Sequence, residues 1–216
     1  MAIAERDGGG IAATIGPMPR SGRSKKAADY ALAGVILLAT LPLLLFIAGL
    51  VRWTSPGPAI YRQLRVGQHG RIIEIYKFRT MYADQCDDGR SRDFRQAGPD
   101  DSRVTPIGRL LRRTGLDELP QFVNVLRGEM SIVGPRPHPL ALHERYAASV
   151  PRYVERYRVK PGVTGWAQVN GLRGETETVE KMAERVRYDL EYIENPSRLL
   201  DLKIILRTAR IVVTSI

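Results

Sequence analysis

The chain has 216 residues, enough for one domain with a hydrophobic core and short appendages. It carries 33 lysines and arginines against 23 aspartates and glutamates, and this formal charge of +10 favours an anionic partner such as nucleic acid, an acidic membrane surface or a phosphorylated substrate. Cys86 is the only cysteine, which excludes an intrachain disulfide. The three histidines form no spaced set with it, so a zinc site is not expected.

The N-terminal quarter of the chain predicts a tail followed by a membrane helix. Residues 1–24 are rich in Gly, Pro, Ala and Arg and have no hydrophobic periodicity, which predicts a disordered basic tail. The stretch 30–51 has no charged residue, and its roughly 22 residues reach about 33 Å as a helix, close to the thickness of a bilayer's hydrocarbon core. We therefore predict a membrane-inserted helix within residues 25–55. A buried core helix is the alternative, but such helices are usually shorter and contain polar positions.

Pro42 lies in the middle of this apolar stretch, where a proline removes a backbone donor and breaks or kinks a helix. Basic residues flank the stretch on both sides, so the positive-inside tendency gives no clear polarity. These residues are Arg20, Arg23, Lys25 and Lys26 before it and Arg52, Arg62 and Arg65 after it. A helix that enters the bilayer, breaks at Pro42 and returns to the cytoplasmic face accounts for both facts. A tilted single span is the alternative.

Residues 56–216 are predicted to form one α/β domain that is mostly helical. Short strands are predicted at 59–61 and 72–78, where apolar and polar residues alternate. Lys77 and Arg79 close the second strand, where alternation would place both cations on one face to meet a phosphate. Solvated surface charges are the plainer interpretation of either residue.

Helices are predicted after Thr105-Pro106, with Thr as N-cap and Pro at the first helical position, and again directly after Asp117. The last predicted helix, at 199–213, is basic and amphipathic. It would lie in the membrane interface or pack on the domain.

Asp117 and Glu118 stand between an arginine-bearing helix and a predicted helix N-terminus, which favours a bound phosphate. Arg112, one turn upstream, would neutralise the same phosphate. In such a site one carboxylate can attack phosphorus while the other holds a divalent ion. The alternative is that Asp117 only caps the helix.

Arg136 lies between two prolines that restrict its backbone, which would pre-organise its guanidinium for a phosphate, although Gly-Pro-Arg-Pro could also be only a rigid turn. The sequence lacks the phosphate loop of ATPases, the dinucleotide-binding glycine motif and the serine hydrolase elbow. These three chemistries are therefore not supported.

Four long motifs extend over the chain from the end of the membrane stretch to the last helix. They are YKFRTM at 76–81, RLLRRTGLDELPQFVNVLRGEMSIVGPRP at 109–137, VKPGVTGWAQVNGLRGETET at 159–178 and YDLEYIENPSRLLDLKIIL at 188–206. Together they closely resemble the bacterial sugar transferase family, the monotopic phosphoglycosyl transferases. On this resemblance Asp117-Glu118 is interpreted as a catalytic pair and no longer as a cap.

The resemblance implies that Asp117 attacks the β-phosphate of a UDP-sugar, releases UMP and carries the sugar phosphate until a polyprenyl phosphate accepts it. Glu118 would coordinate Mg²⁺, whose charge offsets that of the diphosphate. The basic positions expected around the phosphates and the nucleotide-sugar are Lys77, Arg79, Arg112, Arg136 and Arg173.

In this family the membrane segment is a re-entrant helix broken at a proline that often follows a serine, whereas Leu41 precedes Pro42 here. The catalytic domain is expected on the cytoplasmic face of the bacterial inner membrane. The GLRGETET segment at 171–178 resembles the undecaprenyl-phosphate glucose-1-phosphate transferases that start exopolysaccharide synthesis, so glucose is expected ahead of galactose and N-acetylated sugars. The expected partners are the UDP-sugar, undecaprenyl phosphate and the membrane, with a second copy of the chain as a further candidate and no nucleic acid.

Two other functions fit part of the sequence. A membrane-anchored basic module that binds or recruits partners without catalysis would account for the charge and the anchor, but not for Asp117-Glu118 beside the arginines. A conventional glycosyltransferase would release UDP in place of UMP.

Overall fold

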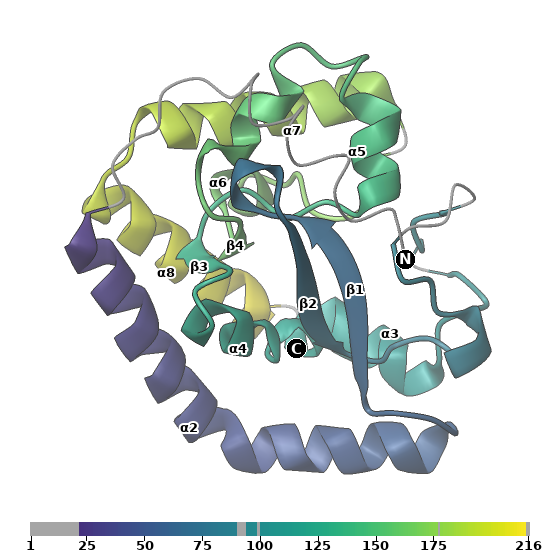
Figure 1. The fold of residues 1–216 in the computed structure, drawn as a ribbon. Helices are drawn as coiled ribbons and strands as arrows, with labels where there is room; N and C mark the ends of the chain where they lie inside the picture. Colours follow the sequence, from purple (N-terminus) through teal and green to yellow (C-terminus); the bar gives the residue numbers. More distant parts are fainter. Residues whose placement is uncertain (1–21, 90–93, 99, 177, 215–216) are drawn as a thin grey trace.

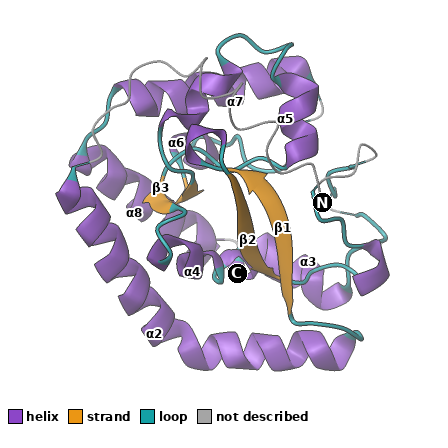
Figure 2. Cartoon of the chain, viewed as in Figure 1, coloured by secondary structure: helices purple, strands orange, loops and turns teal. Residues whose placement is uncertain are grey.

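The structure is a computed structural model that describes residues 22–89, 94–98, 100–176 and 178–214. The predicted tail therefore lies outside the described residues up to residue 21. The helices are α2 (Arg23–Thr54), α3 (Pro106–Thr114), α4 (Gln121–Leu126), α5 (Leu140–Tyr146), α6 (Trp166–Val169), α7 (Val179–Glu194) and α8 (Arg198–Thr214). The strands are β1 (Ile60–Val66), β2 (Ile72–Phe78), β3 (Ser131–Val133) and β4 (Gly162–Thr164). The domain is thus mostly helical with little sheet, as predicted (Figure 2).

Two small sheets organise the domain. β1 and β2 form an antiparallel hairpin in which Ile60 pairs with Phe78 and Val66 pairs with Ile72. β3 and β4 form a short parallel pair. The hairpin runs across the molecule between the long helix α2 and the helices α5 and α7 (Figure 1). Its two ends therefore connect the membrane-helix side of the molecule to the opposite side.

The main hydrophobic core joins the hairpin to the surrounding helices. It includes Val66 and Ile75 of the hairpin, Leu190 of α7 and Ile204 of α8, and it also takes in Ala33 of α2. A second cluster attaches the other end of α2 to the domain, through Ile47, Val51, Phe78 and Leu111. Both parts of α2 are therefore packed on the same domain.

α2 is long and apolar enough to cross a membrane, and only 11% of its most apolar stretch is buried against the described chain. Such exposure does not fit a core helix of a soluble protein, which would be mostly buried. Figure 1 shows α2 bent into two arms. Pro42 lies inside the helix, and the Thr40 hydroxyl donates to the Ile36 carbonyl 2.7 Å away, one turn earlier.

Polar contacts fix the N-terminal arm of α2 to the domain. Lys25 forms an ion pair with Asp201 of α8, with 2.6 Å between nitrogen and oxygen. The Ser131 hydroxyl of β3 donates to the Asp29 carboxylate at 2.7 Å. Charged residues near the start of this apolar helix therefore have partners in the protein.

Arg79 fixes the other end of α2. Its guanidinium is 2% exposed and donates to the Ser55 hydroxyl at 2.7 Å, to the Ser55 carbonyl at 2.8 Å and to the Pro58 carbonyl at 2.7 Å. Arg79 was predicted to lie beside Lys77 at a phosphate. Strand β2 ends at Phe78, however, so the alternation of side chains does not extend to Arg79.

Helix α8 lies close to the predicted bounds, and it packs on the domain, which was one of the two placements considered for it. Ile204 is completely buried in the core. A stripe of apolar side chains on the same helix stays exposed, namely Leu199, Leu202, Leu206 and Val213. Their spacing places them along one side of a helix, as in an interfacial helix.

Candidate active site

The carboxylate pair lies in a tight turn after α3. Thr105 caps this helix as predicted, since its side chain accepts from the Gly108 amide, and Gly115 ends it with a φ of 73°. Asp117 and Glu118 lie in the 3-10 turn Leu116–Glu118 that follows.

The prediction that a helix begins directly after Asp117 is wrong, because α4 begins at Gln121. Pro120 has no N–H to donate to the Leu116 carbonyl, and the Leu119 amide takes that carbonyl at 3.3 Å. Asp117 therefore does not cap a helix.

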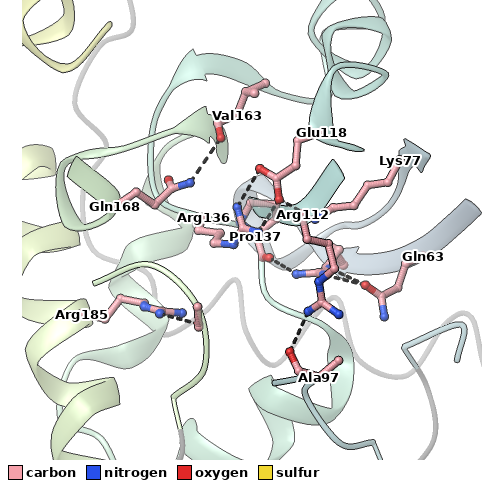
Figure 3. A network of polar contacts seen from close by, with 12 residues as sticks. Gln63, Lys77, Ala97, Arg112, Glu118, Arg136, Pro137, Val163, Gln168 and Arg185 are labelled. Atoms are coloured by element: carbon pink, nitrogen blue, oxygen red, sulfur yellow. Dashed lines mark hydrogen bonds and ion pairs between the residues drawn. The ribbon is translucent and has the colours of Figure 1, made fainter. Parts of the chain in front are cut away.

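Glu118 is held between two cations (Figure 3). Lys77 of β2 lies 2.7 Å from its Oε1, and Arg136 donates to Oε2 at 3.1 Å and also to Oε1. Burial alone would raise the pKa of Glu118, but Arg136 and Lys77 together hold that pKa well below its ordinary value. Glu118 is therefore a fixed, ionised carboxylate.

Asp117 is in a different electrostatic state from its neighbour. It is 8% exposed, and no hydrogen bond to its carboxylate is found among the described residues. Burial raises the pKa of Asp117 from 3.8 to about 6, with the negative charge of Glu118 acting in the same direction and Lys77 opposing it. At neutral pH the group is mostly ionised but poorly stabilised, which suits a carboxylate that forms a bond to phosphorus.

Both carboxylates open into a cavity of about 870 Å³, a size typical of ligand sites. Lys77, Arg112, Arg136 and Arg173 also line it, so the structure brings these four predicted basic residues together with the carboxylates. Arg79 does not line the cavity.

Two further cations of the cavity, Arg112 and Arg173, form no ion pair with Glu118 among the residues that the structure describes. Arg112 donates to the Ala97 carbonyl at 2.7 Å (Figure 3). Arg173 approaches the turn itself, since a Cβ on Gly115 would lie 2.7 Å from its guanidinium. Glycine at position 115 thus allows both the left-handed turn and the approach of Arg173.

Several residues of the cavity wall were not predicted from the sequence as site residues. Tyr61, Gln63 and Arg65 of β1 all line it. Arg65 is held there by its hydrogen bond to the Pro137 carbonyl at 2.6 Å and by Gln63. The period-2 spacing of these three residues was the available signal, but the predicted strand stopped at Tyr61.

The carboxylates of the cavity determine whether it could hold Mg²⁺. Among the described residues no group of three His, Cys, Asp or Glu side chains could hold a metal. Two adjacent carboxylates, Asp117 and Glu118, do fit Mg²⁺, which is commonly held by one or two carboxylates together with substrate phosphates. Glu118 would have to share its oxygens with Lys77 and Arg136.

Fold and site together define a class of protein. Asp117, whose pKa is raised, and Glu118, whose pKa is lowered, lie next to each other in a large cavity that cations also line. Such an arrangement is typical of an enzyme that acts on a phosphorylated substrate. The same domain carries the largely exposed helix α2, which is long and apolar enough to cross a membrane.

Comparison with known proteins gives the particular family. The model of the bacterial sugar transferase family matches residues 20–215. The chain belongs to the bacterial sugar transferase family.

Several curated relatives have names that state an activity. A UDP-glucose:undecaprenyl-phosphate glucose-1-phosphate transferase of Escherichia coli K12 is 52% identical over 184 residues, which cover 85% of this chain and 39% of that protein. A protein of the same name from Caulobacter vibrioides is 47% identical over 93% of this chain and 74% of its own length. An exopolysaccharide production protein of Rhizobium leguminosarum is 43% identical over 85% of this chain and 92% of its own length. The chain thus spans about two fifths of the Escherichia coli relative.

The pKa of Asp117 is raised and that of Glu118 is lowered, so neutral substitutions of the two residues should change the free energy of unfolding in opposite directions. The folded chain binds the Asp117 proton more tightly than the unfolded chain does. Ionisation of Asp117 therefore lowers the free energy of unfolding, and this loss is almost complete above about pH 6. We expect Asp117→Asn to raise the free energy of unfolding by about 1–3 kcal/mol at pH 7.5 and by roughly half as much near pH 5. Glu118→Gln should lower it by about 3 kcal/mol, because Lys77 and Arg136 lose their buried partner.

Thermal unfolding of the two variants in detergent at both pH values measures these effects. A gain for Asp117→Asn that is the same at both pH values would contradict the raised pKa. An unchanged free energy of unfolding for Glu118→Gln would contradict a stabilising role of the contacts of Glu118 with Lys77 and Arg136.

Proposed function

We propose that the chain transfers a hexose-1-phosphate, with glucose-1-phosphate the first candidate, from a UDP-sugar to undecaprenyl phosphate and releases UMP. The observation that carries this proposal is the pairing of a clamped, ionised Glu118 with an Asp117 whose pKa is raised to about 6, within one cationic cavity. The names of relatives 43–52% identical support the substrates and a role in exopolysaccharide synthesis.

In the first step a carboxylate oxygen of Asp117 attacks the β-phosphorus of the UDP-sugar. The bond from that phosphorus to the oxygen bridging the two phosphates breaks, and its electron pair leaves with UMP. The sugar phosphate is then bound to Asp117 as an acyl phosphate. Lys77, Arg112 and Arg136 line the same cavity and would stabilise the charge that develops on the phosphate oxygens.

In the second step an oxygen of undecaprenyl phosphate attacks the same phosphorus and regenerates the Asp117 carboxylate. Glu118, held by Lys77 and Arg136, does not need to react. When bound to Glu118 and the diphosphate, Mg²⁺ would supply positive charge to the leaving group.

The released nucleotide tests this function directly. Purified protein with UDP-glucose, Mg²⁺ and undecaprenyl phosphate should release UMP in equal amount to a lipid-linked product. Asp117→Asn should reduce this rate at least about 1,000-fold because it removes the nucleophile. The same change at exposed Asp84, on the turn Ala83–Gln85, is the matched control and should leave the rate unchanged.

Each other outcome has a clear meaning. Release of UDP would indicate a conventional glycosyltransferase. Failure to release either nucleotide from any UDP-sugar, with lipid present, would favour the binding module without catalysis.

We also propose that α2 is a re-entrant helix that breaks at Pro42 within the inner leaflet, so that the domain lies on the cytoplasmic face of the inner membrane. The N-terminal arm is held by Asp201 and Ser131, and the other end is held by Arg79. One folded domain lies on one side of a bilayer, so a helix tied to it at both ends must return to that side. Thr40 adds to the effect of the proline, because a hydroxyl bonded to the carbonyl one turn earlier often bends a helix.

Single cysteines at the two ends of α2 test this topology. In a Cys86→Ala background, Lys26→Cys and Arg52→Cys occupy exposed positions in the first and second arm. A thiol reagent that cannot cross membranes should label both in inverted vesicles and neither in intact spheroplasts. Labelling of one position from each side would mean that α2 spans the bilayer.

A further inference from the structure

Two buried side-chain nitrogens of residues that line the cavity have no hydrogen-bond partner among the residues that the structure describes. His138 is 1% exposed and lines the cavity, and its Nε2 is unpartnered among the described residues. Arg185 also lines the cavity, and its Nε is unpartnered although another of its nitrogens donates to the Gly174 carbonyl at 2.9 Å (Figure 3). Buried polar groups are nearly always hydrogen-bonded, so two unpartnered nitrogens on residues that line one cavity point to a ligand with acceptor oxygens.

The contacts of His138 determine which of its nitrogens carries the hydrogen. Nδ1 faces the interior, where it meets the Tyr153 hydroxyl at 2.7 Å and the Arg156 guanidinium. An arginine only donates, so Nδ1 accepts and the neutral ring carries its hydrogen on Nε2. Burial, with Arg156 and Arg185 acting in the same direction, lowers the pKa of His138 well below its ordinary value, so the ring is neutral at physiological pH.

His138 is rigidly placed relative to the carboxylate pair. Arg156 donates to the Arg136 carbonyl at 2.8 Å, contacts the His138 ring and is itself held by Asp189 at 2.6 Å. His138 follows Arg136 by two residues, so their Cα atoms are separated by at most about 7 Å. A group attached to a phosphate at Glu118 and Asp117 would therefore come close to this wall.

Cationic and uncharged side chains both line the cavity. Helix α3 contributes Arg109, Arg112 and Arg113 to the wall, a cationic surface that suits the nucleotide phosphate. His138 contributes a neutral donor, and the neighbouring Leu142 contributes an apolar surface. Uncharged hydroxyls and the apolar face of a sugar ring are the groups that such a surface would recognise.

We propose that the Nε2–H of His138 donates a hydrogen bond to a hydroxyl oxygen of the hexose and thereby contributes to the choice of donor sugar. Arg185 supplies the second donor of the same wall. This inference rests on the proposed function and adds to it a residue that determines sugar specificity.

His138→Asn is the informative substitution. The asparagine side-chain oxygen can replace Nδ1 as the acceptor for Arg156 and Tyr153, but no atom replaces Nε2 in the cavity. We would measure kcat/KM by UMP release for UDP-glucose and for its 2-, 3-, 4- and 6-deoxy analogues. With the wild-type chain, one analogue should be about 10- to 100-fold poorer than UDP-glucose because it leaves the buried donor unpaired.

The variant should lose that discrimination, so that UDP-glucose and the same analogue react at similar rates. His138→Gln, whose amide nitrogen can occupy the Nε2 position, should restore part of it. His143→Asn is the matched control, because His143 also contacts a tyrosine hydroxyl through Nδ1, at 3.1 Å from Tyr157, but does not line the cavity. His143→Asn should show the same ratio of kcat/KM values for UDP-glucose and the analogue as the wild-type chain.

Two outcomes are distinguishable. If the wild-type chain releases UMP but His138→Asn keeps full discrimination, or slows every sugar by one common factor, the inference about His138 fails and the proposed function stands. If the wild-type chain releases no UMP from any UDP-hexose, the proposed function fails and the inference fails with it.

Discussion

Glu118 is clamped between Lys77 and Arg136, and the electrostatics of the site depend on this largely buried contact. Lys77 comes from strand β2 and Arg136 from the loop after β3, so the clamp fixes the turn after α3 to two other parts of the domain. The two cations keep Glu118 ionised, and its charge together with burial raises the pKa of Asp117. One carboxylate is thereby held ionised while its neighbour keeps a raised pKa, and this difference is the basis of the separate roles proposed for them.

The same domain holds both ends of the long apolar helix α2. Arg79 lies two residues after Lys77, yet its buried guanidinium holds the end of α2 while Lys77 holds Glu118. The end of β2 therefore couples the membrane attachment to the active site over a very short length of chain. This coupling suits an enzyme whose acceptor is a lipid phosphate, because the phosphate group of such a lipid lies at the membrane surface while its chain stays in the bilayer.

Local chemistry made part of this structure predictable. The cap at Thr105 and the apolar stretch of α2 follow from nearest neighbours in the sequence, and both agree with the structure. The start of α4 was misplaced because the missing N–H of Pro120 was not counted. The role of Arg79 depends on where β2 ends, and the role of His138 depends on Arg156, 18 residues away. Strand β1 was predicted to stop at Tyr61, whereas it continues to Val66 and its Arg65 donates a hydrogen bond to the Pro137 carbonyl.

The central claim is that Asp117 carries the sugar phosphate between the two substrates. Intact mass spectrometry of the detergent-purified chain, given UDP-glucose and Mg²⁺ without lipid, tests it most directly. The account predicts a hexose-phosphate adduct that maps to Asp117 and disappears when undecaprenyl phosphate is added. UMP that forms only in the presence of lipid, with no adduct on the chain at any time, would mean direct transfer between the substrates and would contradict the account.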